Sequence, residues 1–251
     1  MRRYRLPVDP PSFDRITIDG DLFHHVVDVC RQDVGSKFEL LDGQGRAHLV
    51  EVTAIGKRSA ETTRLETRTL PALPKPHLIL ALSVPRFPVL ESVLEKAVEL
   101  GVAEIRLFFS EYSFVRGLDK ISDNRFERWQ KIILSSTQQS GRADLMKLVK
   151  PIPLSEMLAT FNPSAGDQGL LAYEGETPRQ VREVVRRFDP GTPGNWWCFV
   201  GSEGGFSVQE AKAFESQGLH AASLGEQVLR VETACITLLS VLKYEAGHFG
   251  R

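Results

Sequence analysis

A change of pattern at residues 71–76 constrains the fold of this chain more than any other feature. Three prolines fall in this short segment, which is typical of a linker. Beyond it, apolar runs of strand length alternate with amphipathic segments. Strands are predicted over residues 77–84, 102–109, 145–149, 169–173, 196–200 and 219–224, and helices over residues 89–100, 123–140, 177–188, 207–217 and 232–246. Thr177 and Pro178 supply an N-cap and a first-turn proline for the third helix. The alternation predicts an α/β fold with a parallel sheet covered on both faces.

The residues before the prolines carry a different pattern. Strands are predicted over residues 37–41, 47–54 and 61–70, and Asp42-Gly-Gln-Gly45 joins the first two as a hairpin connection. One helix is predicted over residues 21–30. Short strands with a single helix suggest a small barrel-like module. The chain is therefore predicted to hold two domains, residues 1–70 and residues 71–251.

Size and composition narrow the class of protein. The chain has 251 residues, of which 42% are hydrophobic and 25% charged, as in soluble globular proteins. No apolar run approaches the roughly 20 residues that span a bilayer, and the N-terminus lacks an apolar signal core, so we expect a cytoplasmic protein without a membrane partner. A net charge of −1 does not itself call for nucleic acid, so any such surface must be a local patch.

Cysteine and histidine spacing gives no sign of a metal site or a disulfide. The three cysteines, Cys30, Cys198 and Cys235, lie far apart and are expected to be small core residues. His24 and His25 are adjacent, so on a helix they point about 100° apart and are poorly placed to share a metal. We expect no metal in this protein.

A glycine-rich stretch, Gly201-Ser-Glu-Gly-Gly-Phe-Ser207, follows the predicted strand 196–200. Ser207 and Glu210 form a capping box that begins a helix, and Gly218 is its expected stop. Glycines at a strand end followed by a helix N-terminus offer backbone N–H groups to a polar or anionic ligand. Tight turns that only join strand to helix explain the same residues equally well.

A second loop, Leu224-Gly-Glu-Gln-Val-Leu-Arg230, follows the predicted strand 219–224. We expect the two loops to leave neighbouring strand ends, which is the usual place for a ligand in such a sheet. Arg230 and Glu232 precede a mostly apolar helix and are expected to face that ligand. The alternative is that Glu232 stabilises the helix dipole while Arg230 pairs with it.

The helix predicted over residues 123–140 has a polar end. Residues 137–142, Thr-Gln-Gln-Ser-Gly-Arg, are rich in groups that can bind a base edge or a phosphate. Two arginine-rich helical faces are expected to be solvated: Arg125 and Arg128 with Lys131, and Arg179, Arg182, Arg186 and Arg187.

Taken together, four blocks resemble the RsmE-type ribosomal RNA methyltransferases of the SPOUT superfamily. They are His-x5-Arg-x3-Gly over residues 25–35, Lys-Ala-Val-Glu-Leu-Gly-Val over residues 96–102, the run from Arg128 to Arg142, and the two loops described above. The resemblance implies a PUA-like N-terminal barrel and a C-terminal domain with a trefoil knot. It also implies S-adenosylmethionine as cofactor, N3 of a uridine in small-subunit (16S) ribosomal RNA as target, the assembled subunit as substrate, and a homodimer.

The resemblance assigns roles to individual residues. Arg230 and Glu232 would be catalytic, with Glu232 the first candidate for the general base and Glu203 the second. The implied RNA-binding residues are Arg31, Gln138 and Arg142. The implied cofactor-binding residues are Leu171, Gly201, Glu203, Gly204, Leu224, Gly225, Val228, Leu229 and Thr233.

The family's usual Lys-Gly after the first strand of the SPOUT domain is missing, with Arg86 and Phe87 nearby, and four single positions also depart from the family's usual residues. Ser202 stands where the family usually has Pro, Gln227 where it has Arg, Val231 where it has Thr, and Gln138 where it has Glu. Two alternatives therefore stay open. Beside the activity that the resemblance implies, the chain could be a SPOUT enzyme with another RNA target, or a homologue that binds RNA or cofactor without catalysis.

Overall fold

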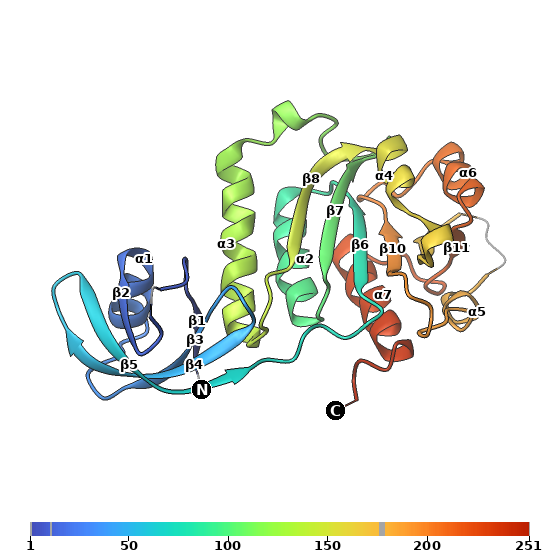
Figure 1. The fold of residues 1–251 in the computed structure, drawn as a ribbon. Coiled ribbons are helices and arrows are strands. Elements are labelled where there is room, and N and C mark those ends of the chain that lie inside the picture. The colour runs from blue at the N-terminus through green and yellow to red at the C-terminus, as the bar shows by residue number, and fades with distance from the viewer. Residues whose placement is uncertain (1, 11, 176–178, 251) are drawn as a thin grey trace. The chain divides into compact units, whose positions relative to one another are not determined.

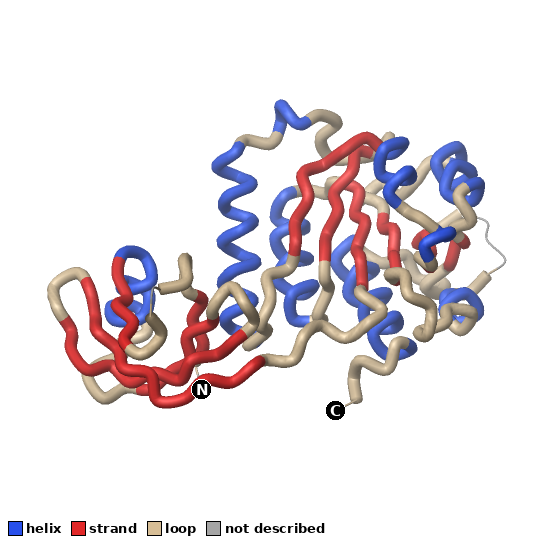
Figure 2. The backbone as a smooth tube through the Cα atoms, viewed as in Figure 1, coloured by secondary structure: helices blue, strands red, loops and turns tan. Residues whose placement is uncertain are grey.

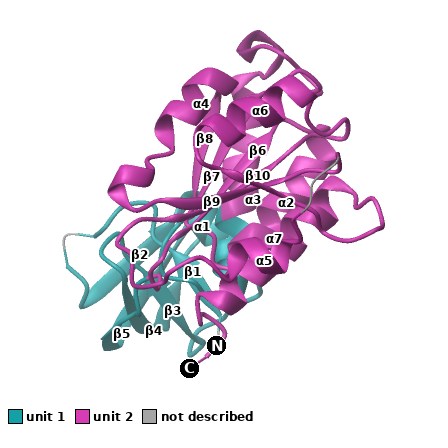
Figure 3. Cartoon of the chain, turned by 90° about the vertical axis from the view of Figure 1, so that its right-hand side faces the viewer, with its two compact units in different colours: residues 1–72, 134–145 teal, residues 73–133, 146–251 magenta. Residues whose placement is uncertain are grey.

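The structure, a computed structural model, describes residues 2–10, 12–175 and 179–250. The chain forms two compact units, shown in Figure 3. The first holds residues 1–72 together with residues 134–145, and the second holds residues 73–133 and 146–251. Within the described ranges, no helix combines the length and the apolar character that crossing a bilayer would require.

The first unit is built on a five-stranded sheet with the order β1-β3-β4-β5-β2. Its elements are β1 (Arg3–Arg5), β2 (Arg15–Asp19), α1 (Gly20–Phe23), the π-helical segment η1 (His24–Val29), β3 (Lys37–Leu41), β4 (Arg46–Ile55) and β5 (Ser59–Thr69). Alternating residues such as Ile16 and Ile18 on β2 turn inward to a core around Tyr4 and Phe38. The pleat that puts alternate side chains on opposite faces thus gives this unit a core of its own.

Residues 134–145 join the first unit through bonds to β1. Arg3 donates to the carbonyl oxygen of Gly141, and Arg5 Nη1 donates to that of Ala143 at 3.0 Å. Ala143 also packs against a small apolar cluster of the first unit that includes Leu41. The polar end of the predicted helix therefore belongs structurally with the N-terminal strands.

The second unit is built on a six-stranded sheet whose strands all run parallel, with the order β11-β9-β10-β6-β7-β8 (Figure 1). Its strands are β6 (Leu78–Ser83), β7 (Glu104–Phe109), β8 (Lys147–Pro153), β9 (Gln168–Ala172), β10 (Trp196–Val200) and β11 (His220–Ala222). Its helical segments are α2 (Phe87–Glu99), η2 (Leu118–Lys120), α3 (Asp123–Ser140), α4 (Leu154–Thr160), η3 (Pro163–Ala165), α5 (Val181–Val185), α6 (Val208–Ser216) and α7 (Val231–Glu245). The last turns of α3 belong to the first unit.

Helices cover both faces of this sheet (Figure 2). Every residue of β6 and β10 is buried, which explains why these strands read as continuous apolar runs. One apolar cluster lies between the sheet and α2, α5 and α7, and it includes Trp129 of α3. A second cluster lies on the other face with α4 and α6 and includes Phe199 and Phe214. The predicted α/β fold with a doubly covered parallel sheet is confirmed.

Two details of the prediction were wrong. The glycine loops follow β10 and β11, but these strands are not neighbours, because β9 lies between them in the sheet. The helix predicted over residues 177–188 is limited to α5, because residues 179–181 pair with Ser223 as an extension of the sheet edge. The predicted N-cap Thr177 and first-turn Pro178 lie outside the described residues. Sequence patterns also missed β1, β2 and α4.

Candidate functional site

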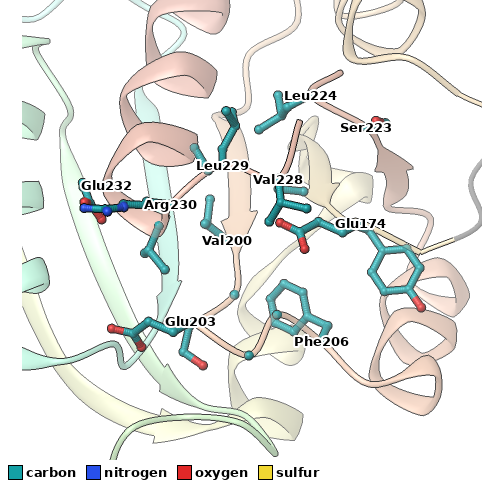
Figure 4. Close-up of a pocket in the computed structure, with 18 of the residues that line it drawn as sticks. Glu174, Val200, Glu203, Phe206, Ser223, Leu224, Val228, Leu229, Arg230 and Glu232 are labelled. Atoms are coloured by element: carbon teal, nitrogen blue, oxygen red, sulfur yellow. The ribbon is translucent and has the colours of Figure 1, made fainter. Parts of the chain in front are cut away.

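A cavity of about 800 Å³ opens at the carboxyl ends of four strands of the second unit (Figure 4). Its walls come from the loops that follow β6, β9, β10 and β11, and from the first turn of α7. The lining residues include Arg86, Tyr173, Glu174, Val200, Gly201, Glu203, Phe206, Ser223, Leu224, Val228, Leu229, Arg230 and Glu232. Parallel strands bring all four loops to one edge of the sheet, so residues distant in sequence form one site.

The loop after β10 turns back sharply on its own strand end. Gly205 N donates to the Ser202 carbonyl at 2.9 Å, and Gly205 has a φ of +67°. A Cβ atom on Gly201 would lie 2.8 Å from Gly205 Cα, which is closer than real Cβ contacts allow. This close approach requires glycine at position 201, and the positive φ favours glycine at position 205. Residues 201–205 of this turn line the cavity.

The capping box predicted for α6 is present and fixes the end of this loop. Ser207 Oγ accepts a hydrogen bond from Glu210 N at 3.3 Å, and Ser207 N donates to Glu210 Oε2 at 2.9 Å. The other carboxylate oxygen, Glu210 Oε1, accepts from Glu111 N at 2.8 Å. The loop after β10, residues 201–207, is called the glycine loop from here on. Its C-terminal end is thus bonded to both α6 and the loop that follows β7.

The loop after β11 forms another wall of the cavity. Ser223 is held by backbone bonds, since its N–H donates to the Arg179 carbonyl at 3.1 Å and its carbonyl accepts from Val181 N at 3.0 Å. Gly225 follows with a φ of +123°, a conformation that favours glycine. Val228 is 78% exposed and lines the cavity. An apolar side chain exposed at a cavity wall is suited to contact with a ligand.

Arg230 and Glu232 stand where α7 begins. Arg230 is the N-cap residue, and its carbonyl accepts from Ala234 N at 2.8 Å. Val231 and Ala234 are buried and anchor the first turn, which leaves Arg230 and Glu232 at the border of the cavity (Figure 4). In the described part of the chain neither side chain has a salt-bridge partner, so Arg230 is not held by Glu232 as the alternative required.

The charge of the lining residues is unbalanced. Glu174, Glu203, Glu226 and Glu232 oppose Arg86 and Arg230, a formal charge of −2. Glu203 is partly engaged, since its Oε1 accepts from Arg86 N at 3.0 Å. An acidic wall favours a cationic ligand over one that carries several phosphates.

Seven of the nine predicted cofactor-binding residues line this cavity, as do Arg230 and Glu232. Leu171 does not, because its side chain is fully buried in the apolar cluster with Phe199, and Thr233 is not among the lining residues either. Sequence patterns missed Arg86, Tyr173 and Glu174. A usable signal existed, because each of these residues comes shortly after the end of a strand in the same sheet.

The three predicted RNA-binding residues all lie in the first unit. Arg31 is exposed and is the non-glycine residue with a positive φ, +53°, among those described. Arg142 pairs with Asp144, with 2.7 Å between Nη2 and Oδ2, and Gln138 is half-buried. Their role in RNA binding stays a prediction.

The two cysteines of the second unit are buried as thiols. Burial raises the pKa of Cys198 to about 12, and burial together with the neighbouring Cys198 raises the pKa of Cys235. Neither supplies a thiolate nucleophile near neutral pH. Among the described residues, no group of three or more histidine, cysteine or acidic side chains is placed to hold a metal ion.

Comparison with known proteins defines the class of this chain. The sequence model of a family described as "RNA methyltransferase domain" matches residues 71–243, and that of a family described as "RNA methyltransferase PUA domain" matches residues 18–63. The first match spans well over half of the chain, so the chain belongs to this family of RNA methyltransferases.

Individual relatives carry a more specific name. Ribosomal RNA small subunit methyltransferase E of Mesomycoplasma hyopneumoniae is 32% identical over 167 residues, which are 66% of this chain and 69% of that protein. The Helicobacter pylori protein of the same name is 28% identical over 227 residues, 90% of this chain and 93% of that protein. A crystal structure of the enzyme from Neisseria gonorrhoeae, bound to S-adenosyl methionine, is 26% identical, covers 97% of both chains and has a TM-score of 0.82. The predicted RsmE-type resemblance is confirmed, while the trefoil knot stays a prediction.

Proposed function

We propose that this protein uses S-adenosylmethionine to methylate N3 of a uridine in small-subunit (16S) ribosomal RNA. One observation carries the proposal: Arg230 and Glu232, without salt-bridge partners among the described residues, border the same cavity as the glycine loop. The name shared by the relatives supports the RNA substrate, and the Neisseria gonorrhoeae structure supports the cofactor.

The cavity fits such a cofactor in volume, lining and charge. Its volume of about 800 Å³ lies in the range of small-molecule sites. The turn at Gly201 and Gly205 lets backbone approach a ligand closely, and Val200, Val228 and Leu229 provide apolar contacts. The formal charge of −2 on the walls complements the net positive charge of S-adenosylmethionine. When bound, this cofactor supplies an electrophilic methyl group on a sulfonium.

Glu232 is the better of the two candidates for the general base. Uracil N3 carries a proton that must leave as the new N–C bond forms, and a carboxylate next to the base can accept it. Glu203 already accepts a hydrogen bond from Arg86 N, which holds it in the loop structure. Glu232 has no salt-bridge partner among the described residues and stands in the first turn of α7. Arg230 then stabilises the negative charge that develops on the uracil oxygens.

The remaining parts of the proposal rest on the family resemblance. Residues 1–70 grip the RNA as a PUA-like domain through Arg31, with Gln138 and Arg142 contributing from the segment that packs with them. The enzyme acts in the cytoplasm, as a homodimer, on the assembled small subunit. Its target uridine leaves the base stack to reach the cavity.

The test compares Glu232→Gln with Glu226→Gln, which removes a charge from another wall of the same cavity. Glu232→Gln is expected to slow methyl transfer by about 10²- to 10⁴-fold, the usual contribution of a general base. Calorimetry should find S-adenosylmethionine affinity within a few fold of the parent for both variants. Glu226→Gln should transfer methyl groups at nearly the parent rate.

Other outcomes would select the alternatives. Full activity of Glu232→Gln would remove it as the base. Methylation at a nucleotide other than a small-subunit uridine would identify an enzyme with a different RNA target. Cofactor binding with no transfer to any RNA would indicate a homologue that binds without catalysis.

A further inference from the structure

The turn that follows β7, residues 110–115, is held in place by hydrogen bonds among buried hydroxyl groups. Ser83 Oγ lies 2.6 Å from Ser110 Oγ and 2.9 Å from Ser113 Oγ, and Ser110 N donates to Ser113 Oγ at 2.8 Å. All three serines are buried. Buried polar groups that satisfy one another in this way fix a single backbone conformation.

The same turn is attached to the glycine loop of the cavity. Ser202 Oγ donates to the Tyr112 carbonyl at 2.5 Å, and Phe114 N donates to the Val84 carbonyl at 2.9 Å. Gly204 packs so closely that a Cβ atom there would lie 2.7 Å from Tyr112 Cβ. The turn and the glycine loop are therefore one preorganised structure, and Gly204 lines the cavity.

This rigid turn leaves two aromatic side chains in solvent. Tyr112 is 44% exposed and Phe114 is 50% exposed. Phe114 meets the edge of Phe87 at 5.3 Å between ring centroids, and the Arg125 guanidinium lies 4.2 Å from the Phe87 ring centre. Exposed rings on a fixed backbone lose little conformational entropy when a planar ligand stacks on them.

The charges around the two rings favour a polyanion. Arg86, Arg116 and Arg125 have no salt-bridge partner within the described part of the chain. The turn itself carries one acidic residue, Glu111, and Glu203 of the adjoining glycine loop accepts a hydrogen bond from Arg86 N. Aromatic rings interleaved with cations are the usual composition of a surface for single-stranded nucleic acid. A purely apolar partner or a second copy of the chain would not call for three arginines without salt-bridge partners.

We propose that Tyr112 and Phe114 form a stacking surface for unpaired bases of the RNA substrate at the rim of the cavity, with Arg86, Arg116 and Arg125 next to its phosphates. The inference rests on the proposed function and adds to it the way in which the RNA reaches the reaction centre. Ser202 acquires a role in this arrangement, because its hydroxyl positions Tyr112.

The experiment measures RNA binding separately from methyl transfer. Tyr112→Ala, Phe114→Ala and the conservative Tyr112→Phe are compared with Tyr244→Ala, which removes a tyrosine that is 72% exposed on α7. The probes are small-subunit ribosomal RNA and a uridine-rich single-stranded oligonucleotide. Each alanine in the turn should weaken RNA binding by about 5- to 150-fold, the range for loss of one base–aromatic stack. Tyr112→Phe and Tyr244→Ala should bind RNA like the parent.

Further readouts distinguish a stacking surface from a structural or self-association role. S-adenosylmethionine affinity and the thermal midpoint should stay unchanged, and KM for RNA should rise more than kcat falls. Unchanged RNA affinity in both alanine variants would overturn the inference, as would a lower sedimentation coefficient with RNA affinity retained. Because binding needs no catalysis, a failure of Glu232 as base would leave this result interpretable.

Discussion

Replacement of Gly201 by alanine tests whether the turn after β10 holds the cofactor. The added Cβ would lie 2.8 Å from Gly205 Cα and 2.9 Å from both Gly205 C and Gly205 O. Carbon atoms in contact prefer about 3.5–4.0 Å, so the two backbone segments must separate by roughly 1 Å. Neither has a flexible side chain that can yield. Because a misplacement of about 1 Å can reduce a rate 10²-fold, we expect a similar loss in S-adenosylmethionine affinity and in methyl transfer.

The matched control is Gly218→Ala at the other end of α6. Gly218 has a φ of +81° and nothing within 4 Å of its Cβ position, so alanine there is strained but meets no neighbour. We expect Gly218→Ala to lose about 1 kcal/mol of unfolding free energy and to keep the parent's cofactor affinity. Calorimetry with S-adenosylmethionine and thermal unfolding of both variants provide the comparison. If Gly201→Ala binds the cofactor as tightly as Gly218→Ala does, the turn does not form the binding site.

Two further predictions concern the first unit. Arg31→Gly relieves a left-handed conformation, so the unfolding free energy should rise by about 1 kcal/mol while RNA affinity falls; a gain in stability with unchanged RNA affinity would remove Arg31 from the RNA-binding surface. Burial alone would raise the pKa of Asp42, but hydrogen bonds from Arg46, Gln44 and His48 lower it from 3.8 to about 2. The lowered pKa contributes about 2 kcal/mol to the unfolding free energy above pH 4, and this contribution is lost as the pH falls through 2. Asp42→Asn should therefore be less stable than the parent at pH 5, by a difference in urea unfolding that shrinks toward pH 2; a constant difference would contradict the linkage.

Local sequence patterns were sufficient to predict many of the helices and strands of the second unit. The apolar run over residues 196–200 is β10, residues 123–140 are α3, and the Ser207–Glu210 capping box begins α6 as predicted. Each of these signals depends on residues close in sequence, through burial of a whole strand, helical periodicity or a cap. Arg230 and Glu232 at the start of α7 were also found in this way.

Features that depend on contacts between distant residues were not predictable. The position of β9 between β10 and β11 is set by strand pairing between distant residues, and the residues of the two loops give no signal for this order. The pairing of residues 179–181 with Ser223 shortened a helix that periodicity favoured. The exposed position of Tyr112 on a fixed turn was not predictable from the sequence, because the turn is held by Ser83 and Ser202, which lie far from it along the chain.

The most direct measurement is transfer of a labelled methyl group from S-adenosylmethionine to small subunits that lack the modification, followed by mapping of the labelled nucleotide. The result expected is label at N3 of a single uridine, lost with Glu232→Gln and retained with Glu226→Gln. Label on another nucleotide would contradict the proposed target, and equal label with both variants would contradict the role of Glu232.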